Sequence, residues 1–179
     1  VPGAHNVLNA LASIALADSL HIAPEIIRKG LMNFSGTDRR FQYKGEMNGF
    51  TIIDDYAHHP TEIKATLHAA QHYPHREIWC VFQPHTYTRT IKLFDRFVEE
   101  LKRPDIAILA EIYAAREQNT MGISSADLAR NIPGSVYCST LDKVTAQLRE
   151  LARPGDLILT VGAGDIYRAG EKLLSETEG

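Results

Sequence analysis

Acidic, imidazole and guanidinium side chains gather in a few short stretches of this sequence. The densest is DDYAHHP, residues 54–60, where Asp55 and His58 precede a proline suited to the first turn of a helix. A carboxylate in such a place can accept hydrogen bonds from a sugar or hold a cation, and a histidine near neutral pH can contact a carboxylate or a phosphate. A structural interpretation is equally open, in which Asp55 caps a turn and the histidines are exposed loop residues.

A metal site, serving a metal-dependent hydrolase, is a further possibility for this stretch. Its ligands would be Asp54, Asp55, His58 and His59. Adjacent histidines rarely aim at one ion from a tight turn, and the two cysteines of the chain form no CxxC spacing. We therefore predict no metal ligands in this sequence and keep the hydrolase as an alternative.

Two other stretches combine polar groups with turn residues. QPHTYTR, residues 83–89, offers the guanidinium fork of Arg89 for a carboxylate or phosphate, with His85 beside it. A polar loop with a threonine cap and a surface ion pair for Arg89 explains the same residues. GAGDI, residues 162–166, has glycines that permit close approach of a ligand, but a tight turn from strand to helix explains them better.

Polar residues near the start of the chain form another group. Asn6 and Asn9 are three residues apart on a predicted helix, so both can face one side. Arg39 and Arg40 follow a break at Gly36. A capping asparagine and a solvated arginine pair are the structural alternatives. The sequence contains neither a GxxxxGK[ST] phosphate loop nor a GxSxG nucleophile elbow, so it lacks the usual devices for activating ATP or forming an acyl-enzyme.

The first 36 residues indicate two helices. Apolar residues recur at helical spacing over about residues 5–19, and Pro24 is placed to begin a second helix before the break at Gly36. Two such helices cannot bury a core alone, so we expect them to end a preceding domain, with a boundary at residue 36. The first residue is valine and not methionine, which hints at a longer protein.

After residue 36, short β-rich segments alternate with helical ones. Strands are predicted at 50–53, 78–82, 106–110, 135–138 and 157–161, helices at about 60–72, 88–101, from 124, 141–151 and 165–174, and an edge strand or hairpin arm at 41–47. This alternation predicts an α/β, Rossmann-like fold, in which a mainly parallel sheet carries helices on both faces. Ligands of such sheets bind beyond the carboxyl ends of the strands, where DDYAHHP, QPHTYTR, EIYAARE and GAGDI would meet.

Composition narrows the class of protein. Of the 179 residues, 44% are hydrophobic and 23% charged, which is ordinary for a globular chain. The formal net charge of -3 argues against nucleic acid as a partner. Apolar stretches are too short to span a membrane, and no basic segment marks a signal peptide. We expect no membrane partner and a reduced, cytoplasmic setting.

Taken in order, these motifs resemble the Mur ligase family, which builds the peptide of peptidoglycan. GAHNVLNALASIALA is similar to the end of the family's central ATPase domain, and TDRRF to the joint into its C-terminal domain. DDYAHHPTE, FQPHTYTRT, EIYAARE and TVGAGDI resemble the member that joins L-alanine to UDP-N-acetylmuramate. The resemblance implies that residues 1–36 end the central domain and that residues 37–179 form a Rossmann-like C-terminal domain.

The resemblance also implies ATP and Mg²⁺ as cofactors and roles for single residues. The nucleotide would be bound by Asn6, Asn9, Arg40, Asp55 and Tyr56, with the ribose on Asp55. His58 and Arg89 would hold the carboxylate of the incoming amino acid, with His85 near them. ATP would convert the carboxylate of the sugar nucleotide into an acyl phosphate, which the alanine amine then attacks with release of phosphate.

Two features depart from the family pattern. The family's phosphate loop, Mg²⁺ ligands and UDP-binding domain are missing from these residues, so the resemblance implies that the chain alone is inactive. Thr86 stands where some relatives have a basic residue, which leaves more of the carboxylate recognition to His85 and Arg89.

Other functions remain open at this level. A sister family attaches the recycled murein tripeptide to the same sugar nucleotide and shares a DDxAHHPT-like motif, although PHTYTR favours the alanine ligase. A nucleotide-binding module without catalysis is the other alternative. The sequence does not give the oligomeric state.

Overall fold

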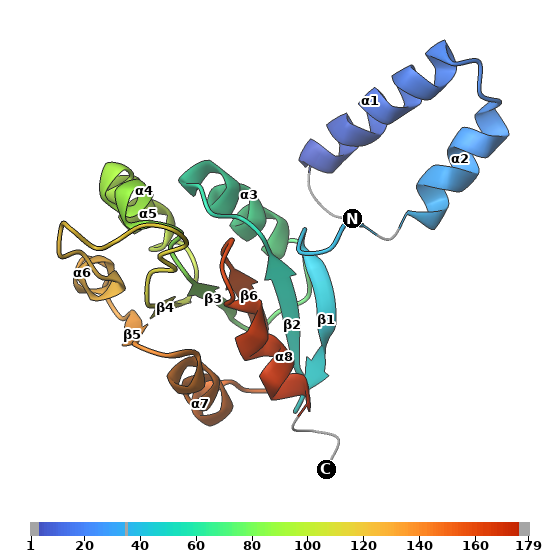
Figure 1. The fold of residues 1–179 in the computed structure, drawn as a ribbon. Coiled ribbons are helices and arrows are strands. Elements are labelled where there is room, and N and C mark those ends of the chain that lie inside the picture. Colours follow the sequence, from blue (N-terminus) through green and yellow to red (C-terminus); the bar gives the residue numbers. More distant parts are fainter. Residues whose placement is uncertain (1–3, 35, 176–179) are drawn as a thin grey trace.

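The chain divides into a helical pair and an α/β unit. The computed structural model describes residues 4–34 and 36–175, with side chains from residue 6 onward. Helices α1 (Ala4–Ser19) and α2 (Pro24–Asn33) contact each other and stand beside the sheet (Figure 1). No described side chain of residues 6–34 is buried. Both helices were predicted, and Pro24 begins α2 as expected.

A six-stranded sheet forms the centre of the α/β unit. Its strands are β1 (Gln42–Met47), β2 (Phe50–Asp55), β3 (Ile78–Phe82), β4 (Ile106–Ala110), β5 (Val136–Cys138) and β6 (Leu157–Val161). They lie in the order β1-β2-β6-β3-β4-β5. Only the edge strand β1 is antiparallel to its neighbour; the other pairings are parallel. The predicted, mainly parallel Rossmann-like sheet is confirmed, and residues 42–47 are the expected edge strand.

Helices cover both faces of the sheet, also as predicted (Figure 1). They are α3 (Pro60–Ala70), α4 (Tyr87–Lys92), α5 (Phe94–Glu100), α6 (Ser125–Arg130), α7 (Leu141–Leu151) and α8 (Tyr167–Ser175). One core packs α3, α5 and α6 against the sheet, with Phe97 and Leu67 fully or nearly buried. The other packs α7 and α8 on the opposite face around Trp79 and Leu148. These two apolar layers fix the carboxyl ends of the strands in space.

Local structure departs from the predictions in few places. The helix expected over 88–101 is two helices, because the backbone of Leu93 leaves the helical region (φ -115, ψ 17) and Leu93 packs against the first core. The last helix begins at Tyr167 and not at residue 165. The helix expected from residue 124 begins with a capping box, in which Ser124 and Asp127 bond each other's backbone N–H groups.

Two further features concern Cys80 and the lengths of the helices. Cys80 lies fully buried in β3, and burial raises the pKa of its thiol to about 12, so it is an inert core residue. Among the residues that the structure describes, no helix combines the length and apolar character needed to cross a bilayer.

Candidate active-site cleft

A cleft of about 1040 Å³ lies between the helical pair and the α/β unit. Its walls come from α1, α2, the joint that follows α2, the end of β2 and α3. Four of the sequence-predicted residues line it: Asn6, Asn9, Arg40 and Asp55. The Asn9 side chain lies 3.5 Å from the Asn6 amide oxygen, so both face the same side of α1 as expected. Residues 49 positions apart in the sequence, such as Asn6 and Asp55, thus share one cavity.

Asp55 ends β2 and is held by the backbone around it. Its carboxylate accepts hydrogen bonds from the amides of Phe41 (2.9 Å) and Ala57 (2.8 Å). Burial raises the pKa of Asp55, and these amides together with the positive charge of Arg40 offset only part of the effect. A carboxylate with two fixed bonds has lone pairs left for hydroxyl donors at the cleft. The structural interpretation, a turn-capping aspartate, is therefore also present in the molecule.

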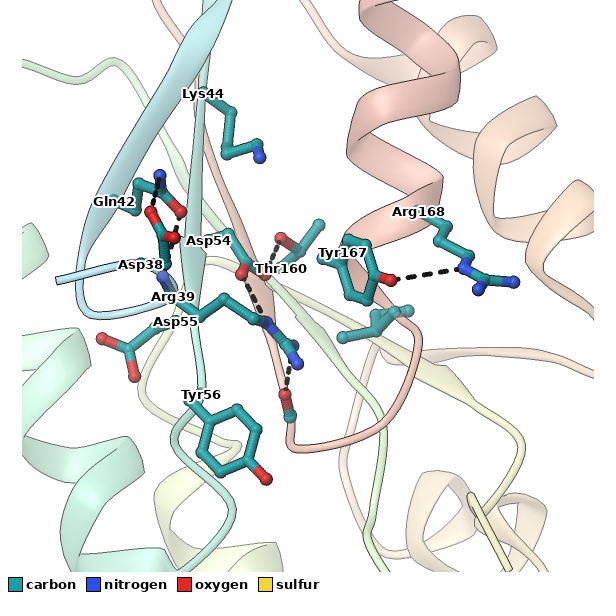
Figure 2. A network of polar contacts seen from close by, with 12 residues as sticks. Asp38, Arg39, Gln42, Lys44, Asp54, Asp55, Tyr56, Thr160, Tyr167 and Arg168 are labelled. Atoms are coloured by element: carbon teal, nitrogen blue, oxygen red, sulfur yellow. Dashed lines mark hydrogen bonds and ion pairs between the residues drawn. The ribbon is translucent and has the colours of Figure 1, made fainter. Parts of the chain in front are cut away.

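The two arginines of the joint behave differently from each other. Arg40 is exposed at the cleft, with its guanidinium 5.7 Å from the centre of the Tyr56 ring. Arg39 is not the solvated residue of the structural alternative: its guanidinium bonds Asp54 and the turn after β6 (Figure 2). Tyr56 itself lies between the two groups of predicted residues, because its ring also meets His58 edge-on at 5.4 Å.

The second group of predicted residues gathers beyond β2 and β3. The rings of His58 and His85 are 6.0 Å apart, and the Arg89 guanidinium lies 3.4 Å from the Nδ1 of His85. An arginine can only donate, so His85 Nδ1 is an acceptor and the ring is neutral. In agreement, burial lowers the pKa of His85, and the charges of Arg89 and His58 lower it further. His58 Nδ1 donates to the Tyr56 carbonyl oxygen at 3.0 Å, which leaves its Nε2 for another partner.

The remaining loops supply Tyr113 and Glu117, which the sequence did not single out, and give His59, a residue of the metal alternative, a structural place. Tyr113, after β4, stacks on His85 with ring centres 5.7 Å apart and bridges to it through the backbone. Glu117 accepts hydrogen bonds from the amide and hydroxyl of Thr88 at the start of α4. His59 caps α3 by accepting from the Thr61 amide. An aromatic and an acidic residue in the stretch EIYAARE were the available signals for Tyr113 and Glu117.

The GAGDI turn is explained by packing, as the sequence favoured. A Cβ on Gly164 would lie 2.3 Å from the Oε1 of Gln83 and 2.7 Å from the Tyr113 ring. Gln83 closes the turn by accepting from the Ile166 amide and donating to Asp165. The glycines thus admit protein atoms and not a ligand.

The acidic pair of DDYAHHP does not converge. Successive residues of a strand point to opposite sides, so Asp54 faces Arg39 and Thr160 while Asp55 faces the joint and the cleft (Figure 2). Over residues 4–34 and 36–175, no three histidine, cysteine or acidic side chains come together as metal ligands would. The geometry therefore offers the hydrolase alternative no support.

Comparison of the sequence with protein-family models identifies the family of this chain. The family model described as "Mur ligase, glutamate ligase domain" matches residues 39–164, which is more than half of the chain. The chain belongs to the Mur ligase family. Its α/β unit is a Mur ligase C-terminal domain, and the resemblance stated from the motifs is confirmed.

Similar Mur ligases agree over the whole chain. UDP-N-acetylmuramate–L-alanine ligases of Lachnospira eligens and Clostridium novyi are 53% and 50% identical to it over 178 residues, 97% of this chain. The crystal structure of the UDP-N-acetylmuramate–alanine ligase of Thermotoga maritima matches 99% of this chain with a TM-score of 0.79 and 29% identity. The chain spans 39% of the length of each of these three proteins.

Proposed function

We propose that this chain is the C-terminal part of an ATP-dependent ligase that joins L-alanine to UDP-N-acetylmuramate. In this proposal residues 1–36 complete a central ATPase domain and residues 37–179 form the domain that receives the amino acid. One observation carries it: the Tyr56 ring lies 5.7 Å from the guanidinium of Arg40, a cleft residue, and 5.4 Å from the ring of His58. A nucleotide in the cleft and an amino acid beside His58 would then be neighbours, as attack on an acyl phosphate requires.

The cleft fits a nucleotide in size and chemistry. Its volume suits a ligand of drug size or larger, and it presents a cation, an amide pair and a carboxylate acceptor. Asp55 would accept from the ribose hydroxyls, and Arg40 would contact the phosphates or base. Asn6 and Asn9 would approach the nucleotide from α1, and Tyr56 would line the end of the pocket.

The histidine–arginine group fits the carboxylate of a small amino acid. Arg89 supplies a permanent charge, and His85, held neutral, supplies one N–H in a fixed direction because Arg89 occupies its Nδ1. His58 Nε2 would complete the group. These contacts orient the amino acid, so that its amine faces the activated carboxylate; this chain positions groups and supplies no nucleophile of its own.

Mg²⁺ and the phosphate loop must come from residues outside this chain in the proposal. The described residues offer acceptors for the nucleotide but no cluster of carboxylates for Mg²⁺. When bound, Mg²⁺ would neutralise the charge that develops on the transferring phosphate. On this basis the 179 residues alone would bind nucleotide weakly and turn over none.

A murein peptide ligase is the second candidate of the same family. The crystal structure of such a ligase from Psychrobacter arcticus matches this fold with a TM-score of 0.69 and 24% identity, which supports the fold alone. The alanine ligases of Lachnospira eligens and Clostridium novyi are 53% and 50% identical to this chain and that of Thermotoga maritima 29%, and the segment PHTYTR is the feature that favours them.

The test is an assay of the full-length protein that contains this chain. Phosphate release from ATP should require both UDP-N-acetylmuramate and L-alanine, and the tripeptide L-Ala-γ-D-Glu-meso-diaminopimelate should not replace alanine. Arg89→Gln should raise the KM for alanine about 30-fold or more, as loss of a charged hydrogen-bond partner does, and leave the KM for ATP within about twofold. Turnover with the tripeptide alone would transfer the proposal to the recycling ligase.

A control variant separates loss of function from loss of fold. Arg130→Gln removes an arginine that is 73% exposed on α6 and pairs with Asp127, so it should leave both KM values unchanged. If Arg89→Gln also leaves the KM for alanine unchanged, the amino-acid site proposed here is wrong.

A further inference from the structure

We infer that Arg39 is a positioning residue that locks the joint between the helical pair and the α/β unit and thereby presents Arg40 to the cleft. The functional half of this inference rests on the nucleotide site proposed above. The structural half rests on contacts of Arg39 that no ligand is needed to explain. Arg39 differs from its neighbour Arg40 because its guanidinium is already hydrogen-bonded to protein acceptors.

The Arg39 guanidinium uses its donors on three different partners. Nε donates to Asp54 Oδ2 at 2.9 Å, Nη2 to the Gly162 carbonyl at 2.6 Å and Nη1 to the Gly164 carbonyl at 3.1 Å (Figure 2). These partners belong to β2 and to the turn after β6. One side chain therefore ties the joint to two neighbouring strands of the sheet.

Two aromatic rings also contact the Arg39 guanidinium, one from the loop after β2 and one from the first residue of α8. Its central carbon lies 5.0 Å from the Tyr56 ring and 4.6 Å from the Tyr167 ring. A planar guanidinium can stack on rings and donate in its plane at the same time. A lysine ammonium also has donors and can contact a ring, but it lacks the planar fork that reaches three acceptors while lying between two rings, so lysine should not replace Arg39.

The charge of Arg39 is already matched inside the protein. Asp54 is 1% exposed, and its second oxygen accepts from the Thr160 hydroxyl at 2.7 Å. Arg39 thus completes a polar network with three of its five N–H donors on protein acceptors. It is not among the residues that line the cleft, so its influence on a ligand there would pass through the residues beside it.

The backbone is held by hydrogen bonds on both sides of Arg40, at residues 39 and 41. The Arg39 backbone, at φ 58, accepts from the Tyr56 amide at 2.7 Å and donates to the Gln42 side chain at 2.9 Å. The Phe41 amide donates to Asp55 at 2.9 Å. Residues 39 and 41 are both fixed to β2, so the direction of Arg40 between them is fixed as well.

The experiment compares variants of this 179-residue chain by amide hydrogen exchange and by ADP titration calorimetry. Arg39→Gln leaves Asp54 buried and unpaired, which threatens the fold. We therefore pair it with Arg39→Met/Asp54→Asn, which removes both charges together. The Phe41 and Tyr56 amides should exchange about tenfold faster in the double variant, while the Cys80 amide in β3 stays as protected as in the wild type. Arg130→Gln is the matched arginine control and should change none of the three.

A thermodynamic cycle then asks whether Arg39 acts through Arg40. In the wild-type background, Arg39→Met/Asp54→Asn should weaken ADP binding about five- to tenfold; in an Arg40→Gln background it should weaken it less than about twofold. A merely structural residue would lower affinity equally in both backgrounds, and that result would overturn the positioning role. Unchanged exchange at Phe41 and Tyr56 would overturn the lock itself.

The outcomes keep this inference separate from the proposed function. If the wild-type chain binds no ADP and the exchange changes as expected, the lock stands and the proposed nucleotide site fails. If ADP binds, Arg40→Gln weakens it and the exchange does not change, the nucleotide site stands and the lock fails.

Discussion

The helical pair and the α/β unit obey the same local rules but differ in what they bury. In the α/β unit, apolar faces of helices and strands meet in two cores, and residues such as Phe97 and Trp79 are excluded from water. In the helical pair, Leu8 and Leu16 remain 67% and 63% exposed, although apolar residues recur there at helical spacing too. A helix with an apolar face and no partner is only marginally stable, so the pair depends on a surface that these residues do not supply.

This contrast separates the two walls of the cleft. Asp55 and the end of β2 belong to a unit that holds itself together. Asn6 and Asn9 sit on a helix that depends on a covering surface for its place. The part of the nucleotide site that this chain supplies in our proposal is therefore fixed on the side of the α/β unit only. Together with the phosphate loop and Mg²⁺ ligands that the proposal places outside this chain, this is why we expect weak binding by the chain alone.

The largest expected effect is at the centre of the first core. Phe97→Ala removes a ring that is 0% exposed and lies 5.3 Å from the Phe82 ring, and should lower the free energy of unfolding by about 3–5 kcal/mol. The matched change in the helical pair, Leu11→Ala, removes a side chain that is 55% exposed and should cost less than about 0.5 kcal/mol. Urea titrations followed by the fluorescence of Trp79, the single tryptophan, measure the α/β unit for both variants.

Far-UV circular dichroism on the same samples detects the helical pair as well. In the wild type, the unfolding transition measured by circular dichroism should begin at a lower urea concentration than the transition measured by Trp79 fluorescence, because the helical pair unfolds first. Coincident transitions, together with a large cost of Leu11→Ala, would show that the pair is part of the main cooperative unit and would break the contrast.

A smaller effect is expected where glycine meets protein atoms. Gly164→Ala puts a Cβ within 2.3 Å of Gln83 and 2.7 Å of Tyr113 and should destabilise the α/β unit by about 1–3 kcal/mol. In Gly30→Ala, the new Cβ in α2 meets no atom within 4 Å. This substitution should stabilise the helical conformation of α2 by about 1 kcal/mol and leave the Trp79 transition unchanged. Equal effects of the two substitutions on that transition would contradict the division into two units.

Much of this architecture followed from the sequence because its signals are local. Period and turn residues placed nearly every strand within two residues, and the rule that parallel strands end at one edge brought His58, His85 and Arg89 together before any coordinates. Even the helix starts at Pro24 and Ser124 needed only capping preferences.

What escaped the sequence depends on contacts between distant segments. Nothing in the sequence near Arg39 and Arg40 indicates that Arg39 is bonded within the protein while Arg40 stays exposed. The partners of Arg39, Asp54 and Gly162, lie 15 and 123 residues away. The break at Leu93 likewise follows from packing on the core and not from a helix-breaking residue. Tyr113 and Glu117 were missed because a loop after β4 gives no period to interpret.

The smallest effect, on His85, tests whether the amino-acid group belongs to the α/β unit alone. Burial and then Arg89 hold the pKa of His85 below the ordinary 6.5 for histidine. Because the folded chain binds this proton less readily than the unfolded chain, the contribution of His85 to stability is present above pH 6.5 and is lost as the pH falls through its lower, folded pKa. Arg89→Gln removes one cause and should raise the pKa of His85, measured by NMR titration of the imidazole protons.

The comparison of the two units makes the titration sharper. Leu11→Ala loosens only the helical pair and should leave the pKa of His85 where it is, as should Arg130→Gln on the far surface of α6. If Leu11→Ala shifts the pKa of His85 as much as Arg89→Gln does, α1 must reach the histidine group in solution. The two walls of the cleft would then be coupled through the joint at Arg39, and the α/β unit would not be the independent half that its buried cores indicate.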